Sequence, residues 1–168
     1  MAAQQIALVT GGNRGIGLAI AHQLGARGIR VVITARSAAQ GEAAVTQLKT
    51  AGVDAHWLLL DVADEVSRQL AAAQLLQEQG RIHILVNNAG VALDKWVPAQ
   101  QLELDVLRAT METNLYGPLR LCQLLLPAMH AQGFGRIVNL SSELGSLSQS
   151  SMGGSAAYRI SKTALNML

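Results

Sequence analysis

Residues 6–17, which read IALVTGGNRGIG, decide the fold of this chain of 168 residues. An apolar run typical of a buried strand leads through glycines into a segment of helical period. Glycines at such a junction let the backbone approach a phosphate, and the helix that follows offers free N–H groups. A glycine-rich string also fits a tight turn with close helix–strand packing, but its place between a strand and a helix favours nucleotide binding. The candidate cofactor-binding residues here are Gly11, Asn13, Arg14, Gly15, Ile16 and Gly17.

Apolar runs continue to alternate with helical segments along the rest of the chain. Strands are expected at 6–10, 30–35, 53–60, 82–87 and 136–140, and helices at 15–27, 38–51, 65–79 and from 156 to the last residue. A long helical region at 98–132 is interrupted near Asn114 and at Gly117-Pro118. Ser37, Asp64 and Ser155 are the expected N-caps. Strands that alternate with crossover helices predict a single α/β domain over residues 1–168, a Rossmann-type, doubly wound parallel sheet of five strands.

The composition excludes several classes of protein. Half of the chain is hydrophobic and 14% is charged, which allows a sizeable core and excludes a disordered chain. One cysteine excludes a disulfide framework, and the four histidines lack ligand spacing, so no metal is expected. Scattered basic residues and few aromatics predict no nucleic-acid partner. No apolar stretch reaches the roughly 20 residues of a membrane span and no signal sequence is visible, so we expect a cytoplasmic protein without a membrane partner.

The end of the second expected strand indicates which dinucleotide is bound. A carboxylate there would hold the ribose 2′-hydroxyl of NAD, but the chain reads Thr34-Ala35-Arg36. Arg36 and Arg14 place two guanidiniums where a 2′-phosphate would lie, and a guanidinium can grip phosphate bidentately. Two solvated surface arginines are the alternative. Their joint placement, without a carboxylate, favours NADP(H) as the cofactor.

A phenol and an ammonium lie four residues apart near the end of the chain, at Tyr158 and Lys162. On a helix these two side chains share a face. A neighbouring cation lowers the pKa of a phenol from about 10 toward values useful for acid–base chemistry at neutral pH. The same spacing also fits a tyrosine packed under the stem of a surface lysine, so the pair alone is weak support for catalysis.

Further motifs lie between the glycine loop and this pair. Val-Asn-Asn-Ala-Gly stands at 86–90, Asn114 interrupts the long helical region, and Asn-Leu-Ser-Ser at 139–142 is followed by Gly145. With these motifs the chain, from Ile6 onward, resembles the short-chain dehydrogenase/reductase family. Its motifs are most similar to those of the carbonyl reductase branch. It lacks, however, the long insertion before the tyrosine that marks the monomeric animal carbonyl reductases.

The resemblance implies a role for each motif residue. Tyr158 would be the general acid that protonates the carbonyl oxygen as hydride arrives, and Lys162 would lower its pKa and bind the nicotinamide ribose. Ser142 would polarise the substrate carbonyl, with Ser141 as the second candidate. Asn114 would complete a proton relay through Lys162. Two O–H donors aimed at an oxygen that gains negative charge stabilise the transition state.

The resemblance also adds residues on the adenosine side of the cofactor. Asn88, Ala89 and Gly90 would line the adenosine ribose and secure the sheet. Asp61 and Val62 would meet the adenine, and a turn or a helix cap is the alternative role for Asp61.

Members of this family continue past the Tyr-x-x-x-Lys helix into two further strands and a mobile substrate-binding segment. These do not lie within the 168 residues, so we expect a domain incomplete at its C-terminal side, with the fifth strand as an open sheet edge. Two functions stay open: an NADPH-dependent reductase of a small-molecule carbonyl (aldehyde, ketone or quinone), or an inactive NADP(H)-binding or partner-binding module. The long helix and the Tyr-bearing helix, a dimer face in many relatives, form the candidate face for a homo-oligomer.

Overall fold

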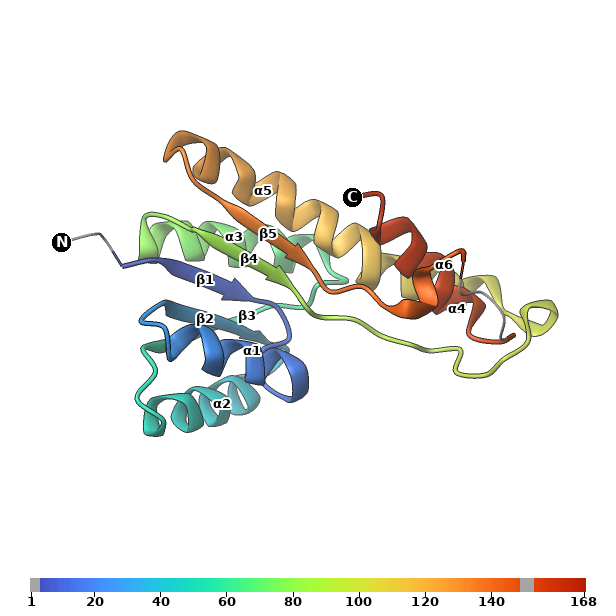
Figure 1. Cartoon of the computed structure of the whole chain (residues 1–168), viewed down its shortest axis with the longest axis horizontal. Helices are drawn as coiled ribbons and strands as arrows, with labels where there is room; N and C mark the ends of the chain where they lie inside the picture. Colours follow the sequence, from blue (N-terminus) through green and yellow to red (C-terminus); the bar gives the residue numbers. More distant parts are fainter. Residues whose placement is uncertain (1–3, 149–152) are drawn as a thin grey trace.

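The computed structural model describes residues 4–148 and 153–168, and its five strands form one parallel sheet (Figure 1). The order of the strands is β3-β2-β1-β4-β5, so the chain starts in the middle of the sheet and winds outward in both directions. The strands are β1 (Ile6–Val9), β2 (Arg30–Ala35), β3 (Ala55–Leu59), β4 (Ile84–Asn87) and β5 (Arg136–Asn139). The predicted doubly wound α/β fold is confirmed.

Helices cover both faces of this sheet. They are α1 (Gly15–Gly25), α2 (Ala38–Thr50), α3 (Glu65–Gln79), α4 (Leu104–Met111), α5 (Gly117–Ala131) and α6 (Ala156–Leu165). Because successive strand residues point to opposite faces, neighbours in β1 enter different cores. Leu8 packs in the core formed with α3 and α5, whereas Val9 packs in the core formed with α1 and α2. The strands are therefore apolar along almost their whole length, as expected for a sheet that is covered on both sides.

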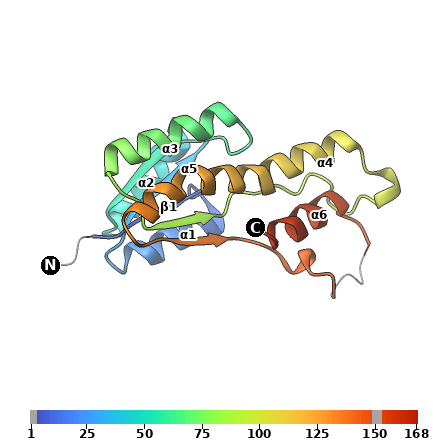
Figure 2. The same ribbon diagram turned by 90° about the horizontal axis from the view of Figure 1, so that it is seen from above.

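The long helical region predicted at 98–132 consists of several pieces. A 3-10 turn, η1 (Ala99–Gln101), precedes α4, and a π-helical turn, η2 (Glu112–Tyr116), joins α4 to α5. The interruption predicted near Asn114 is this π-helical turn, whereas the separation of η1 from α4 was not predicted. Figure 2 shows α4 extending away from the sheet beside α6, beyond the ends of β4 and β5.

The ends of several elements differ from the prediction. β3 and β4 begin two residues later than expected. The N–H of Val53 still donates to Leu48 at the end of α2, and the N–H of His83 donates to the Ile6 carbonyl just before β4 begins. The last helix does not continue to the last residue but ends at Leu165. The next side chain, Asn166, accepts the Ser141 hydroxyl at 2.5 Å and donates to the Gly145 carbonyl at 3.3 Å, which fixes the chain where the helix stops.

The three predicted N-caps have different outcomes. Asp64 caps α3, because its carboxylate accepts the Ser67 N–H at 2.6 Å. Ser37 and Ser155 occupy the N-cap positions of α2 and α6, but neither side chain makes a cap hydrogen bond. Two N–H groups in the first turn of α6 are instead bound by the side chain of Asp94.

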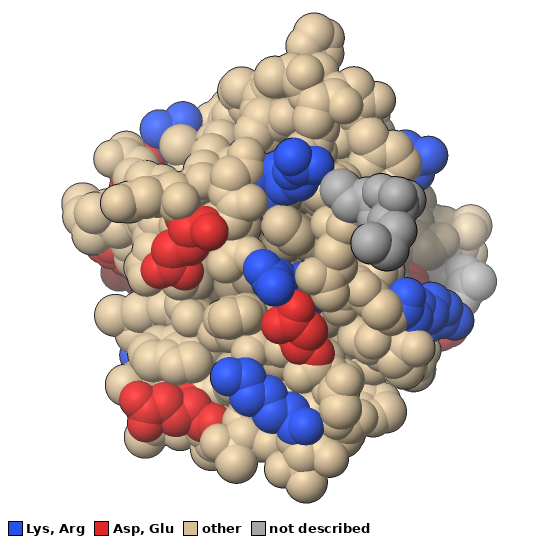
Figure 3. Space-filling model, turned by 90° about the vertical axis from the view of Figure 1, so that its left-hand side faces the viewer, with Lys and Arg blue, Asp and Glu red and all other residues tan. Residues whose placement is uncertain are grey.

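β5 forms one edge of the sheet, as the sequence predicts. Ile137 is 36% exposed and Val138 is 47% exposed, whereas β1 and β2, in the interior of the sheet, are almost wholly buried. On the face drawn in Figure 3, Lys and Arg side chains are interspersed with Asp and Glu and form no continuous basic stripe. None of the helices in the described ranges is long and apolar enough to cross a membrane.

Candidate functional site

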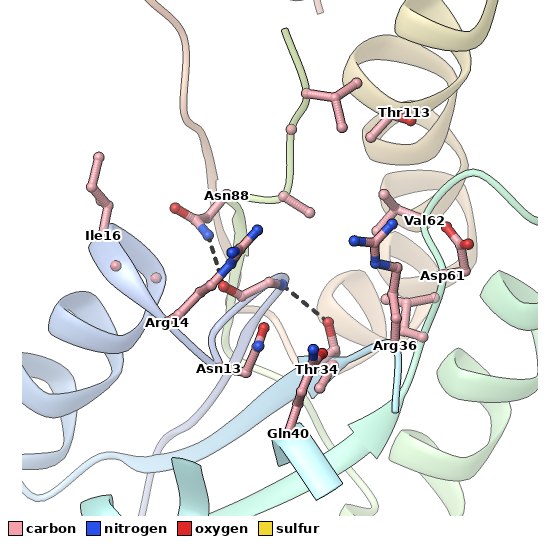
Figure 4. Close-up of a pocket in the computed structure, with 18 of the residues that line it drawn as sticks. Asn13, Arg14, Ile16, Thr34, Arg36, Gln40, Asp61, Val62, Asn88 and Thr113 are labelled. Carbon is pink, nitrogen blue, oxygen red and sulfur yellow. Dashed lines mark hydrogen bonds between the residues drawn. The ribbon is translucent and has the colours of Figure 1, made fainter. Parts of the chain in front are cut away.

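A pocket of about 580 Å³ opens at the carboxyl ends of β1, β2 and β4 (Figure 4). This is where doubly wound sheets bind their ligands, because the strand order reverses there. The pocket brings together every candidate cofactor-binding residue that precedes α4. These residues are Gly11, Asn13, Arg14, Gly15, Ile16, Gly17, Arg36, Asp61, Val62, Asn88, Ala89 and Gly90.

The glycine turn between β1 and α1 is held by hydrogen bonds from the neighbouring strands. The side-chain amide of Asn88 donates to the carbonyls of Thr10 and Gly11 at 2.8 and 3.2 Å. The Gly11 N–H donates to the Thr34 hydroxyl at 3.1 Å. The Thr10 hydroxyl accepts the N–H groups of Asn88 and Ala89. The turn is thus tied on one side to β2 and on the other to the segment after β4.

Gly17 shows why this turn needs glycine. A Cβ atom there would lie 2.5 Å from the Asn88 side-chain nitrogen and 2.5 Å from the Gly11 carbonyl oxygen. Gly11 itself has a φ of +60°, which L side chains rarely adopt. The first turn of α1 can therefore lie against the strand only without side chains at these positions.

The N-terminus of α1 faces the pocket without a side-chain cap. Its N-cap residue, Arg14, is extended and makes no cap hydrogen bond. The first N–H groups of a helix have no partner within the helix, and the helix dipole adds a partial positive charge there. This end of α1 can bind the pyrophosphate of a dinucleotide.

Arg14 and Arg36 both line the pocket, Arg36 beside the Asp61–Val62 segment and Arg14 nearer Asn88 (Figure 4). In the described part of the chain, no carboxylate forms an ion pair with either guanidinium. Both side chains are exposed and can turn toward a ligand anion. The residues present fit a dinucleotide that carries an additional phosphate.

Asp61 takes part in a turn as well as in the pocket wall. Its carboxylate accepts the Ala63 N–H at 3.0 Å, and its own N–H donates to the Ser67 hydroxyl at 2.9 Å. The Val62 carbonyl accepts the buried Arg68 guanidinium at 2.7 Å. The alternative role given to Asp61 by the sequence, a turn, therefore coexists with its place in the pocket.

The four candidate catalytic residues do not line this pocket, but Lys162, on α6, contacts a residue that does. Its side chain is buried, with 5% exposed, and its ammonium donates to the carbonyl of the pocket residue Leu140 at 2.6 Å. The ammonium nitrogen is 5.8 Å from the centre of the Tyr158 ring, so the two side chains share one face of the helix as predicted. Burial lowers the pKa of Lys162 below its ordinary value.

Asn114 is fully buried in the π-helical turn and holds two other segments together. Its side chain accepts the Val91 N–H and donates to the Val91 carbonyl, both at 2.8 Å, and it also donates to the Ser161 hydroxyl of α6 at 2.9 Å. A Cβ atom on Gly90 would lie 3.3 Å from the Asn114 carbonyl oxygen and 3.6 Å from the Lys162 nitrogen. Asn114 and Lys162 therefore meet behind Gly90, at the edge of the pocket.

The two candidate serines differ in their contacts. The Ser141 hydroxyl donates to Asn166 at the end of α6. The Ser142 hydroxyl oxygen accepts the Leu144 N–H at 3.2 Å and caps the short 3-10 helix η3 (Glu143–Gly145). No hydrogen-bond acceptor for the Ser142 O–H is found among the residues that the structure describes, so its proton can be offered to a ligand. This difference favours Ser142 over Ser141.

The sequence reasoning missed several residues of this site. Thr34, Gln40, Thr113 and Leu140 line the pocket but were not among the candidates. Thr34 and Leu140 lie within two of the motifs named above, Thr34-Ala35-Arg36 and Asn-Leu-Ser-Ser at 139–142, and their position at the end of a strand is the signal that could have found them. Asp94, which binds the start of α6, has no signal in its local sequence.

Comparisons with known proteins agree with this geometry. The sequence profile of the short chain dehydrogenase family matches residues 5–168. NADPH carbonyl reductase 1 of Macaca fascicularis is 42% identical over 140 residues, which cover 82% of this chain and 49% of that relative. The 3-oxoacyl-acyl-carrier-protein reductase FabG of Escherichia coli strain K12 is 36% identical over 161 residues, or 96% of this chain and 63% of that relative.

A solved structure of a metagenomic short-chain oxidoreductase in complex with NADP is also similar. It is 37% identical, with a TM-score of 0.84, and the match covers 97% of this chain and 72% of that protein. The chain spans about half the length of the carbonyl reductases that it matches. The match over nearly its whole length shows that the chain belongs to the short-chain dehydrogenase family of oxidoreductases.

Proposed function

We propose that this chain carries the cofactor site and the acid–base groups of an NADPH-dependent reductase of aldehydes, ketones or quinones. The observation that supports this most strongly is the placement of Lys162. A buried ammonium, held at the pocket rim by the Leu140 carbonyl, lies beside a phenol and next to Asn114. Burying a charged lysine is costly, so such an arrangement favours a chemical role over simple packing.

NADP(H) is the cofactor that best fits the pocket. Its pyrophosphate would lie at the uncapped N-terminus of α1, and its 2′-phosphate would lie between Arg14 and Arg36. The names of a carbonyl reductase relative and of a solved structural neighbour, which mention NADPH and NADP, support the same cofactor. When bound, NADPH supplies the hydride for the carbonyl carbon.

Tyr158 would give its phenolic proton to the carbonyl oxygen as negative charge develops there. The Ser142 O–H would donate a second hydrogen bond to the same oxygen, which stabilises the charge in the transition state. The products would be an alcohol and the oxidised cofactor, with the proton from Tyr158 on the new hydroxyl.

Lys162 would make this proton transfer feasible near neutral pH. A positive charge beside the ring stabilises the negative charge that develops on the phenolic oxygen as the proton leaves. Asn114 would hold Val91 and α6 in a fixed position relative to each other. Lys162 could then pass a proton from solvent to the phenolate.

The test is the loss of NADPH absorbance in the presence of menadione or an aromatic aldehyde. Tyr158→Phe removes the proton donor but keeps the ring, so we expect the rate to fall by about 100-fold or more, in line with the general acid–base contribution. Tyr116→Phe changes the other tyrosine of the chain and is the matched control; its rate should equal that of the wild type. Equal rates for wild type and Tyr158→Phe would reject the assignment of the acid.

A second function, an NADP(H)-binding module without turnover, is favoured by the exposed edge at β5. Ile137 and Val138 offer an apolar strand edge on which a further segment or a partner could pair. Tight binding of NADPH without its consumption across a broad panel of carbonyl compounds would favour the module over the reductase.

A further inference from the structure

Asp94, in the segment between β4 and η1, binds the first turn of α6. The residue is buried, with 1% exposed. Its carboxylate accepts the N–H of Ala157 at 2.7 Å and the N–H of Tyr158 at 3.3 Å. A residue 64 positions earlier in the chain thus contacts the backbone of the proposed general acid.

This carboxylate replaces the cap that the helix does not supply for itself. Ser155 stands at the N-cap position, but its hydroxyl accepts the Trp96 N–H at 3.1 Å instead of an N–H of α6. The two segments therefore cap each other: the side chain of Asp94 binds the helix, and the side chain of Ser155 binds the segment that carries Asp94. We call this group of Asp94, Trp96, Ser155, Ala157 and Tyr158 the α6 clasp.

The backbone of the clasp is strained. Among the described residues, Trp96 and Ser155 are the non-glycine residues with a positive φ, at +62° and +54°. Beside them Gly154 has a φ of +83°, and a Cβ atom there would lie 3.1 Å from the Trp96 Cα. Strain of this kind persists only where surrounding contacts hold it in place, and it is concentrated at functional sites.

The segment that carries Asp94 is fastened at its other end as well. Asn114 holds Val91 through two hydrogen bonds and also binds Ser161 on the second turn of α6. The segment 91–96 therefore connects the π-helical turn to the start of α6. Tyr158 lies in the first turn of this helix and Lys162 one turn later, so the position of the helix start sets the position of both side chains.

We propose that Asp94 is a positioning residue, which places α6 so that Tyr158 and Lys162 meet the nicotinamide end of the cofactor. The inference rests on the proposed function for the identity of the cofactor. An ordinary helix cap would add stability alone, as Asp64 is expected to do on α3. Asp94 should in addition control binding at one half of the pocket only.

The test compares two ligands that share the adenosine half. Adenosine 2′,5′-bisphosphate lacks the nicotinamide half, and NADPH contains both. For Asp94→Ala we expect calorimetry to show NADPH binding weakened about tenfold, because a displaced α6 would lose roughly one charge-assisted hydrogen bond to the nicotinamide half. Binding of the bisphosphate should be unchanged. Asp94→Asn keeps one acceptor oxygen and should recover part of the NADPH affinity.

Asp64→Ala is the matched control, because it removes the carboxylate cap of a helix outside the proposed chemistry. It should lower the midpoint of thermal unfolding by about 2–4 °C, like Asp94→Ala, without changing the ratio of the two affinities. Unchanged NADPH affinity in Asp94→Ala would make Asp94 an ordinary cap and overturn the proposal. An equal loss for both ligands would also overturn it, since the effect would then extend over the whole pocket.

Amide hydrogen exchange in the free chain separates this inference from the proposed function. If the wild type binds neither ligand, the proposed function is wrong, and exchange alone decides the role of Asp94. Faster exchange in Asp94→Ala that reaches Ser161 and Lys162 supports a carboxylate that positions the helix. Faster exchange limited to Ala157 and Tyr158 would show a local cap and reject the proposal.

Discussion

The two helices that carry the candidate site residues, α1 and α6, have N-termini that are built in opposite ways. α1 starts with glycines and an uncapped N-terminus, and its N-cap residue is an arginine. α6 starts with two N–H groups already bound by the buried carboxylate of Asp94. One end of the site is therefore open to an anion, and the other is closed by an anion from the chain itself.

The two N-termini use the same electrostatic attraction for different purposes. Free N–H groups and the helix dipole attract a ligand phosphate to α1. At α6 the same attraction is satisfied internally, so it fixes the helix instead of a ligand. The side chains that α6 carries one turn apart, Tyr158 and Lys162, can then be held in place before any ligand binds.

The largest effect is expected from a change at the open end of the site, the uncapped N-terminus of α1. Gly17→Ala places a Cβ atom 2.5 Å from both the Asn88 side chain and the Gly11 carbonyl, so the glycine turn must move away from the strand. Since two or more hydrogen bonds to phosphate are lost with it, we expect NADPH binding to weaken by about 100-fold or more in calorimetric titration. Ala19→Ser, an exposed change on the same helix, should bind like the wild type. Binding within threefold of wild type by Gly17→Ala would show that α1 is not the phosphate site.

A smaller effect on cofactor binding is expected from the two arginines at the open end. Arg14→Ala and Arg36→Ala should each weaken NADPH binding about tenfold, because each removes a charge-assisted contact to the 2′-phosphate. Binding of NADH, which lacks this phosphate, should stay the same. Arg27→Ala, on an exposed arginine at the far end of α1, is the control. If both cofactors weaken equally, or if the chain prefers NADH, the two arginines do not select NADP(H).

The open end was predictable from the sequence because its determinants are local. The strand, the glycines and the arginines of residues 6–17 and 34–36 follow one another along the chain, and their place in a βαβ unit favours nucleotide binding over a plain tight turn. The same holds for Asn114, where a π-helical turn coincides with the predicted interruption.

The closed end was predictable only in part. The spacing of Tyr158 and Lys162 gives their common face, but not the carbonyl of Leu140 that binds the ammonium. Ser155 has the sequence of a helix cap, yet its hydroxyl binds Trp96 because a better acceptor, Asp94, occupies the helix end. A contact across 63 residues leaves no period or motif in the sequence, so only the folded chain shows it.

The smallest expected effect concerns the charge buried at the closed end. Burial lowers the pKa of Lys162 in the folded chain, whereas in the unfolded chain it returns to its ordinary value near 10.5. Between these two pKa values the unfolded state binds more protons, so the free energy of unfolding rises with pH there, by at most about 1.4 kcal/mol per pH unit for one group. Below the folded pKa both states are protonated and this contribution is constant.

Lys162→Met removes this titration and keeps an apolar stem of similar length. The free energy of unfolding of the wild type should therefore rise relative to that of Lys162→Met as the pH rises toward 10.5, measured by urea denaturation at each pH. Lys49→Met, on an exposed lysine of α2, should show no such trend. Parallel pH profiles for wild type and Lys162→Met would mean that the ammonium is solvated rather than buried. The closed end would then hold no buried lysine charge to set against the open end at α1.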